Sequence, residues 1–576
     1  MKSGLKLRVI SIVGLFGVSL ISLFSSLYFL INRSSIFLEW NIFNINSSNV
    51  VGAVILDWIS IIFMSFVCFI SSIVLYYSGG YIRGDENIDR FLYLVLSFVL
   101  SIVFLIISPN LVSILLGWDG LGLVSYVLVI YYQNENSANA GILTVLSNRI
   151  GDVAILLSIS IILTQGGWNF IFNQGLISHG ILLLLLLGAC TKRAQIPFSA
   201  WLPAAIAAPT PVSALVHSST LVTAGVYLII RFRPSLGYTE QIVLFVLGCT
   251  TTFISSLGAF LETDLKKIIA LSTLSQLGLI ITTLSLGWAE LAFFHLLTHA
   301  LFKALLFIRA GSIIHRVNGY QDVRFIGCLS FNKSLRVSLI NLANLALCGT
   351  PFLAGFYSKD LILEIILTNS MNEFGLYFII ISTRLTVCYT FRLIYLSITG
   401  SYNLGSLSFV EDEDNEMTNP IMFLRIGGVM GGSFLSWLIF PYPSIICLPI
   451  FFKFIVLIVS ILGGLIGYLS NIVSVRYKVL SIKIYKFIVF SGSMWFIPLI
   501  RTWGLSSRVL KIGQIYSHAL DTGWFEYYGG QGTYRLFRNL IIRLQRMQDG
   551  NIKLYLLVMF IWLVVFLLLG FLGSLN

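Results

Sequence analysis

The sequence predicts an all-α integral membrane protein with about 15 transmembrane helices. Of its 576 residues, 57% are hydrophobic and 10% are charged, whereas about 25% of the residues in a soluble domain are charged. Its mean hydropathy is +0.92. Apolar stretches of about 20 residues, the length that crosses a bilayer as a helix, recur along nearly the whole chain.

The same sequence speaks against several kinds of cofactor site. Its seven cysteines include no C-x-x-C pair, which argues against an iron–sulfur cluster, a zinc site or a disulfide framework. It also contains no P-loop and no G-x-G-x-x-G motif after a strand. We therefore expect that this chain binds no metal and no redox cofactor of its own.

The first apolar stretch lies near residues 8–31 and follows a basic start, as a secretory signal does. It is too long for a signal and no convincing small-residue cleavage site follows, so we expect it to be the first span. Further spans are expected near residues 50–77, 91–107, 110–131, 140–164, 178–205, 212–232, 239–262, 264–285, 289–314, 336–367, 372–399, 421–440, 449–470 and 552–574. The run 484–500 is ambiguous and could be a sixteenth span.

An odd number of spans places the two termini on opposite sides of the membrane. The side that carries the N-terminus and residues 471–551 is the richer in Lys and Arg. The positive-inside rule makes it the cytoplasmic or matrix side. Arg231 and Arg233 fall on the other side, against this rule.

Residues 501–550 differ from everything before them. They form an amphipathic segment with regularly spaced arginines and an interruption at Gly529-Gly530, which predicts a long helix along the membrane surface. We therefore divide the chain into N-terminal transmembrane helices (1–90), a core (91–400), additional transmembrane helices (401–500), the lateral surface helix (501–550) and a C-terminal transmembrane anchor (551–576).

Two expected spans are interrupted by a lysine and a proline. Lys192 lies in the run Ala189 to Pro197, and Lys359 in the run Gly349 to Asp360. Paired helices broken by Gly or Pro are a sequence pointer to inverted repeats with an ion site near the midplane. The broken backbone can hold water or charge inside the membrane. The alternative is a pair of kinks whose lysines reach the membrane surface.

The strongest candidate site is a row of ionisable residues in the expected span 289–314. His295, His299 and Lys303 are spaced four residues apart and therefore share one face of a helix. Such groups persist inside a membrane only where that face meets water or polar partners, so the row predicts a proton path. A metal bound by the two histidines is disfavoured, because no third ligand is evident.

Other ionisable residues are ambiguous when each is taken alone. Asp119 lies in an apolar region, where it is either a carboxylate at a helix end or interface or the partner of a buried lysine, for which Lys192 is the candidate. His217 is either a packing histidine or a proton relay. Asp152 follows Arg149 at i, i+3 and could form a local salt pair. Lys266 lies near Asp264 at the start of a helix, where it either takes up protons or compensates the helix dipole.

Three runs together carry a family resemblance. They are APTPVSALVHSST from Ala208 to Thr220, FHLLTHALFKALLF from Phe294 to Phe307, and PFLAGFYSKD from Pro351 to Asp360. The chain resembles the antiporter-like subunits of respiratory complex I over essentially its whole length. The surface helix after the penultimate span is specific to the largest of these subunits.

The resemblance implies a fold with two inverted five-helix repeats within 91–400 and a hydrated polar axis along the membrane plane. It implies proton translocation through a regulating ion pair of Asp119 and Lys192, with Lys303 as the central lysine. The connecting and outlet residues would be His217, His295, His299, Lys359 and Asp360. Asp152 and Lys266 match further functional positions whose roles the resemblance leaves open.

The resemblance also implies a setting. The chain would be a multi-pass subunit of the mitochondrial inner membrane, with its N-terminus and lateral helix on the matrix side. NAD, FMN, iron–sulfur clusters and ubiquinone would be handled by other subunits of the complex. The partners expected are neighbouring antiporter-like subunits under the lateral helix and membrane lipids, with cardiolipin as a candidate, and not nucleic acid.

Some residues depart from the family pattern. Relatives usually have glutamate where this chain has Asp119, which shortens the reach to Lys192 by one methylene. Arg193, Arg309 and Arg384 fall inside expected spans, where relatives carry small or uncharged residues. Many invertebrate mitochondria read AGA and AGG as serine, so these three arginines are interpreted as serines translated with the wrong code.

Two other functions remain open from the sequence. One is a stand-alone monovalent cation/proton antiporter, which would have no need of a surface helix that braces neighbours. The other is a haem-bearing membrane oxidoreductase that uses two of His217, His295 and His299 as axial ligands.

Overall fold

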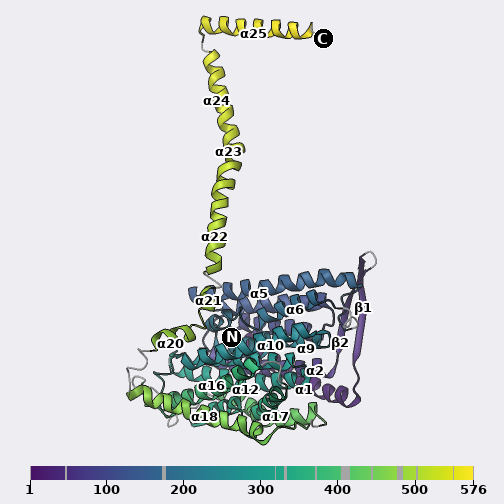
Figure 1. The fold of residues 1–576 in the computed structure, drawn as a ribbon, viewed down its shortest axis with the longest axis vertical. Helices are drawn as coiled ribbons and strands as arrows, with labels where there is room; N and C mark the ends of the chain where they lie inside the picture. The colour runs from purple at the N-terminus through teal and green to yellow at the C-terminus, as the bar shows by residue number, and fades with distance from the viewer. Residues whose placement is uncertain are drawn as a thin grey trace. The chain divides into compact units, whose positions relative to one another are not determined.

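The computed structural model describes residues 2–574 except 46–47, 172–176, 318, 330–333, 370–372, 402, 404–414, 443–444, 477–483, 501–503 and 549. The chain divides into two compact units, Met1–Pro498 and Leu499–Asn576. Most of the described residues are helical (Figure 1). The helical membrane fold predicted from composition is therefore confirmed.

The first unit is built from long apolar helices, together with two expected spans that are divided into shorter helices. Its long helices are α1 (Lys2–Asn32), α2 (Trp58–Tyr81), α3 (Ile88–Ile107), α4 (Leu111–Val129), α5 (Glu135–Ile162), α9 (Leu221–Phe232), α10 (Tyr238–Leu261), α11 (Leu265–Ser285), α12 (Ala289–Arg316), α16 (Glu373–Ile394), α17 (Asn415–Ile439) and α18 (Ile450–Arg476). Shorter elements are η1 (Leu163–Gln165), α8 (Thr210–Val212), η4 (Arg233–Ser235), η5 (Tyr395–Thr399), α20 (Tyr485–Gly492) and α21 (Ile497–Leu499).

Thirteen helices of the described residues are long and apolar enough to cross a membrane. The sequence predicts fifteen spans, and the difference lies in 178–205 and 336–367. The first divides into α6 (His179–Lys192), α7 (Trp201–Ala204) and η2 (Ala205–Ala207), and the second into α14 (Ser334–Cys348) and α15 (Ala354–Thr368). Both breaks fall where Pro and Lys interrupt the apolar pattern. The run 484–500 forms only α20 and α21, too short for a sixteenth span.

A β-hairpin near the N-terminus is absent from the sequence prediction. Strand β1 (Ile36–Ile45) pairs antiparallel with β2 (Ser48–Leu56), with a register irregularity between Asn41 and Phe43. The expected span 50–77 is therefore wrong at its start, because β2 occupies its first residues and α2 begins only at Trp58. The hairpin lies at one end of the helical bundle (Figure 1), where the Asn110 side chain donates to the carbonyl of Val51 at 3.1 Å.

Helix α12 is the most enclosed element of the first unit. Every residue from Leu291 to Ile314 is buried, and α12 lies among the other helices of the bundle (Figure 1). Helix α11 packs beside it and is also buried along its length. The predicted histidine–lysine row therefore faces other protein helices and not lipid.

The second unit continues the chain as a series of helices. They are α22 (Leu505–Tyr516), η7 (Ser517–Trp524), α23 (Phe525–Tyr528), α24 (Gly530–Gln548) and α25 (Ile552–Gly573). Helix α24 carries Arg535, Arg538, Arg543 and Arg546 among exposed apolar residues, as an amphipathic surface helix does. Helix α25 is an apolar helix of 22 residues, long enough to span a membrane.

Candidate functional site

The first cluster of the site surrounds Lys192 at the end of α6. This lysine is fully buried, and its ammonium donates to the backbone carbonyl of Trp118. Its Nζ also lies 4.2 Å from the centre of the Trp118 ring, a cation–π contact. The structure thus brings α6 and α4 together at the break that the sequence predicts.

Trp118 is a member of the site that the sequence analysis misses. Its indole N–H donates to Oδ1 of Asp152 at 2.9 Å, so one tryptophan contacts both the lysine and a carboxylate. Its position directly before Asp119 is the only sequence signal for this role. A buried indole requires a hydrogen-bond partner, and here that partner is a buried acid.

The two predicted acids lie around Lys192 without a direct contact to it. Asp119 and Asp152 are both close enough for electrostatic interaction with the lysine. Among the described residues, however, no carboxylate lies within 4.0 Å of its ammonium. Asp152 also meets Arg149 at 3.7 Å, the local pair expected from their spacing. The Lys192 ammonium therefore lies near two acids and forms a direct ion pair with neither of them.

The second cluster is the row on α12. His295, His299 and Lys303 are all at most 1% exposed, and the ring centres of the two histidines are 6.3 Å apart. Lys303 donates to the hydroxyl of Ser272 on α11 at 2.5 Å. Within the described residues, both ring nitrogens of His299 are buried without a hydrogen-bond partner. The row is enclosed by protein, and its polar groups are only partly satisfied.

The row continues from α12 into the broken helix α15. Nδ1 of His295 lies 2.9 Å from the Ser358 hydroxyl, which also lies 3.2 Å from the Thr298 hydroxyl. Ser358 directly precedes Lys359, and the Lys359 ammonium donates to Thr386 at 3.1 Å. Ser358 is a second residue that the sequence analysis misses. It connects the histidines to the second broken helix.

The break between α14 and α15 supplies the other partners of Lys359. Its ammonium donates to the carbonyls of Leu347 and Cys348 at 3.4 and 3.3 Å, groups that an unbroken helix would keep within its own ladder. Lys359 and Asp360 line a cavity of about 20 Å³. A space of that size is large enough for one water molecule.

Two further predicted residues lie outside these contacts. His217 is buried within the π-helical segment η3 (Ser213–Thr220), with its ring centre 6.2 Å from that of Trp201. Lys266 is buried near the start of α11. No hydrogen bond within the described residues joins either side chain to the Lys192 cluster or to the α12 row.

Two of the three arginines that depart from the family pattern are deeply placed, and Arg384 is half-buried. Arg193 and Arg309 are fully buried. Arg193 donates from Nη2 to the carbonyl of Gly225 at 2.9 Å, while its Nε and Nη1 have no partner among the described residues. An uncompensated buried charge costs several kcal/mol. Serine at position 193 stays a prediction of the sequence, and peptide mass spectrometry across this residue would test it.

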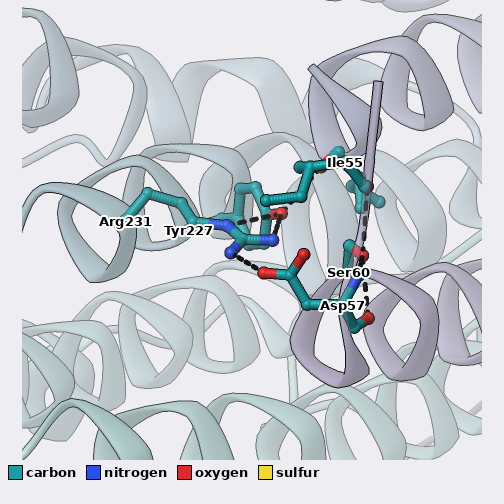
Figure 2. A network of polar contacts seen from close by, with 6 residues as sticks. Ile55, Asp57, Ser60, Tyr227 and Arg231 are labelled. Carbon is teal, nitrogen blue, oxygen red and sulfur yellow. Dashed lines mark hydrogen bonds and ion pairs between the residues drawn. The ribbon is translucent and has the colours of Figure 1, made fainter. Parts of the chain in front are cut away.

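Arg231, which breaks the positive-inside rule, is neutralised within the fold. It pairs with Asp57, the residue before α2, and donates to the Tyr227 hydroxyl at 2.9 and 2.7 Å (Figure 2). Tyr227 in turn donates to the carbonyl of Ile106 at 2.7 Å. The positive-inside rule concerns charges in loops, and Arg231 is a paired structural charge.

The comparisons with known proteins cover nearly the whole chain. Three family models match: the chain 5 N-terminus of NADH-ubiquinone oxidoreductase (complex I) over residues 40–92, the NADH:quinone oxidoreductase/Mrp antiporter membrane region over 108–386, and the NADH dehydrogenase subunit 5 C-terminus over 389–570. Among solved structures, the Mrp complex from a Dietzia species matches with a TM-score of 0.68 at 21% identity. That match covers 99% of this chain and 61% of the other, and it supports the antiporter-like fold.

Curated relatives are much closer in sequence. NADH-ubiquinone oxidoreductase chain 5 of Anopheles gambiae is 53% identical over 97% of this chain and 98% of its own. The same protein of Locusta migratoria is 52% identical over 96% of this chain and 98% of its own. Both matches extend over nearly the whole length of this chain and of the relative. The chain therefore belongs to the NADH-ubiquinone oxidoreductase chain 5 family.

Proposed function

We propose that this chain is a core membrane subunit of respiratory complex I that translocates protons across the mitochondrial inner membrane. The buried row of Lys303, His299 and His295, continued through Ser358 to Lys359, is the observation that carries the proposal. Ionisable groups placed this deep in a membrane protein mark proton or ion pathways. NADH oxidation and ubiquinone reduction would take place in other subunits, where NAD, FMN and the iron–sulfur clusters are bound.

The Lys192 cluster has the properties of a switch for this pathway. An ion pair at 4 Å with an effective dielectric near 20 is worth about 4 kcal/mol. Moving one proton against about 150–200 mV costs about 3.5–4.6 kcal/mol. Closing or opening a pair between Lys192 and Asp119 is therefore of the right size to load or unload a buried proton. Asp152 would offer a second acid to the same lysine.

The remaining site residues have proposed places along the path. Lys303 would be the central proton carrier and His299 and His295 its relay to Lys359, with Asp360 toward the outlet. His217 would connect the Lys192 cluster to Lys303 through water. Lys266 would join the path near the start of α11.

Family membership and the apolar helices support a setting in the mitochondrial inner membrane. The subunit would be a multi-pass protein of the inner membrane, with its N-terminus and the helices α22 to α24 on the matrix side. Helices α22 to α24 would lie against neighbouring antiporter-like subunits. Lipids would cover the exposed apolar helix faces, and cardiolipin is the anionic lipid suited to the arginines of α24.

The second candidate function is a stand-alone monovalent cation/proton antiporter. The fold shared with an Mrp complex is the observation that favours it. The family match over residues 389–570, which includes the amphipathic α24, favours the complex I subunit. Purification of the chain within an NADH-oxidising assembly would separate the two functions.

The test of the proposed function is Lys303→Ala in the assembled complex. The substitution removes the central ammonium, so we expect proton pumping to be largely abolished while the complex still assembles. The measurement is the proton-to-electron ratio in closed vesicles during NADH oxidation. Lys453→Ala, which removes an exposed lysine from the first turn of α18, is the control and should pump normally. A normal ratio in Lys303→Ala would refute the proposal.

A further inference from the structure

A polar cavity of about 590 Å³ opens near the first turn of α12. It lies where α1 and α17 end and where α2 and α12 begin. Its lining includes the charged side chains of Arg33, Asp57 and Glu290, together with Ser34 and Ser35. A cavity of this size with several charged groups readily holds water. Neither the sequence analysis nor the proposed path assigns it a role.

Two aromatic pairs form the boundary between this cavity and the α12 row. Trp58 lines the cavity and packs edge-on against Phe293, with ring centres 5.9 Å apart. Phe440 also lines it and packs edge-on against Phe294 at 5.7 Å. Phe293 and Phe294 are fully buried and directly precede His295. The cavity therefore ends at the residues next to the outermost histidine of the row.

His295 is the residue of the row that lies nearest to this boundary along α12. Glu290 lies five positions before it on α12, which corresponds to a rise of about 7.5 Å and a rotation of about 140° about the helix axis. The two side chains therefore leave the helix on different faces. Its Nδ1 is engaged by Ser358, whereas its Nε2 is buried without a hydrogen-bond partner among the described residues. One ring nitrogen thus faces the Lys359 side of the path, and the other remains available.

The charged side chains that line the cavity differ in whether they form an ion pair. One carboxylate oxygen of Asp57 pairs with Arg231 (Figure 2), so this acid is part of a structural ion pair. Glu290 is exposed and, among the described residues, has no ion-pair partner. Arg33 is the other exposed charge of the lining. Glu290 is therefore the acid of this cavity that is exposed and lies outside an ion pair among the described residues.

We propose that this cavity is a proton port, in which Glu290 exchanges protons between water and His295 across a seal formed by the Trp58–Phe293 and Phe294–Phe440 pairs. The port rests on the proposed function, because it serves the row that carries it. Water enters the seal only when the rings separate, and the proton then passes between the Glu290 carboxylate and Nε2 of His295. The port opens at the end of the bundle where α12 begins.

The first test is Glu290→Gln in the assembled complex. Loss of a positioned proton-transfer group slows transfer by about 10²-fold or more, so we expect slow proton pumping in this variant. We further expect pumping by the parent complex to respond to the pH on the port side alone, and this response to disappear in Glu290→Gln. Glu373→Gln removes an exposed acid from the first turn of α16 and should retain both the rate and the pH response.

The second test reports on the cavity without removing an acid. Ser35→Cys places a thiol in the lining, and a membrane-impermeant thiol reagent applied from the port side should then block pumping in proportion to labelling. The parent chain, whose Cys447 is exposed, is treated identically as the control. Normal pumping after complete labelling of Ser35→Cys, or an unchanged pH response in Glu290→Gln, would overturn the port.

The outcome for Lys303→Ala separates this inference from the proposed function. If Lys303→Ala abolishes pumping while Glu290→Gln is normal, the row conducts protons but the port lies elsewhere. If neither variant alters pumping, the proposed function itself fails.

Discussion

At the scale of single residues, Trp118 explains how one lysine is held between two acids. Its carbonyl and ring contact Lys192, and its indole N–H contacts Asp152. A hydrogen bond to a charged group is worth about 1.5–3 kcal/mol. The indole therefore fixes the position of the Asp152 carboxylate. Through that position it influences whether Asp119 or Asp152 pairs with Lys192.

Trp118→Phe tests this positioning role. Phenylalanine keeps an aromatic ring and the backbone carbonyl but removes the N–H, so Asp152 loses this hydrogen bond and is left with its ion pair to Arg149. Loss of about 1.5–3 kcal/mol corresponds to about a ten- to hundredfold shift between lysine arrangements. We expect slower proton pumping with a displaced pH profile, measured in vesicles at a series of pH values.

The control for this substitution is Trp168→Phe. Trp168 donates its indole N–H to the backbone carbonyl of Ile159 at 3.2 Å, so this variant loses a similar bond away from the acids. It should keep the pH profile of the parent. Equal profiles for both variants would show that Trp118 serves packing alone.

At the scale of elements, the sequence predicts the broken helices but not the hairpin. Pro and Lys interrupt the apolar pattern at both breaks, with Gly as well at the second, and Pro and Gly are strong local signals. Strand β2 is apolar and runs directly into α2, so a hydropathy window merges the two. The available signal is the Asp57-x-x-Ser60 pattern, in which the Ser60 hydroxyl accepts from the Asp57 N–H at 2.9 Å, as a helix-start motif does.

A connecting loop outside the membrane-spanning helices offers an element-scale prediction. Residues 321–323 pair with 263–265: Leu265 N–H donates to Gln321 at 2.9 Å and Val323 N–H to Thr263 at 3.0 Å. Hydrogen bonds from Arg324 hold the pKa of Asp322 below its ordinary value. A carboxylate with a lowered folded-state pKa stabilises the fold above its unfolded pKa of about 4, and this contribution is lost as the pH falls through the folded value.

Asp322→Asn should loosen this pairing at neutral pH. An exposed ion pair is worth about 0.2–1 kcal/mol, so we expect the amides of Leu265 and Val323 to exchange hydrogen up to about fivefold faster. In the parent chain, the Leu265 and Val323 amides should reach the same faster exchange only in strong acid, where Asp322 is protonated. The measured rates are first corrected for the intrinsic pH dependence of amide exchange. The Asp85 amide, which donates to Ile82 in another loop, is the internal reference. Unchanged exchange at both amides at pH 7 would contradict the prediction.

At the scale of the whole molecule, periodicity identifies which residues share a helix face but not which helices meet. The spacing of His295, His299 and Lys303 predicts their row, because it depends on one helix. Ser272, Ser358 and Trp118 enter the site from other helices, and a single sequence carries no signal for those contacts. The candidate residues were thus predictable from local pattern, and the connections between them required the tertiary structure.

The division of the chain at Pro498 leads to the last prediction. The first unit contains the Lys192 cluster and the α12 row, and the second contains the amphipathic α24 and the apolar α25. A chain that ends at Pro498 should therefore keep a folded, protease-resistant first unit. It should nevertheless assemble poorly with neighbouring subunits, because the proposed brace is missing. Native gel electrophoresis of detergent-solubilised membranes would measure the share of chain in the full complex.

A second variant distinguishes loss of the proposed contact between α24 and neighbouring subunits from loss of the membrane anchor α25. Replacing Arg535, Arg538, Arg543 and Arg546 by glutamine leaves α25 intact and removes only the basic face of α24. If α24 contacts acidic lipids or partner surfaces through this face, assembly should fall in this variant too, more so at high salt, because exposed charge interactions are screened. Full assembly of both variants would mean that the second unit does not brace the complex, and would leave proton translocation by the first unit as the sole role of the chain.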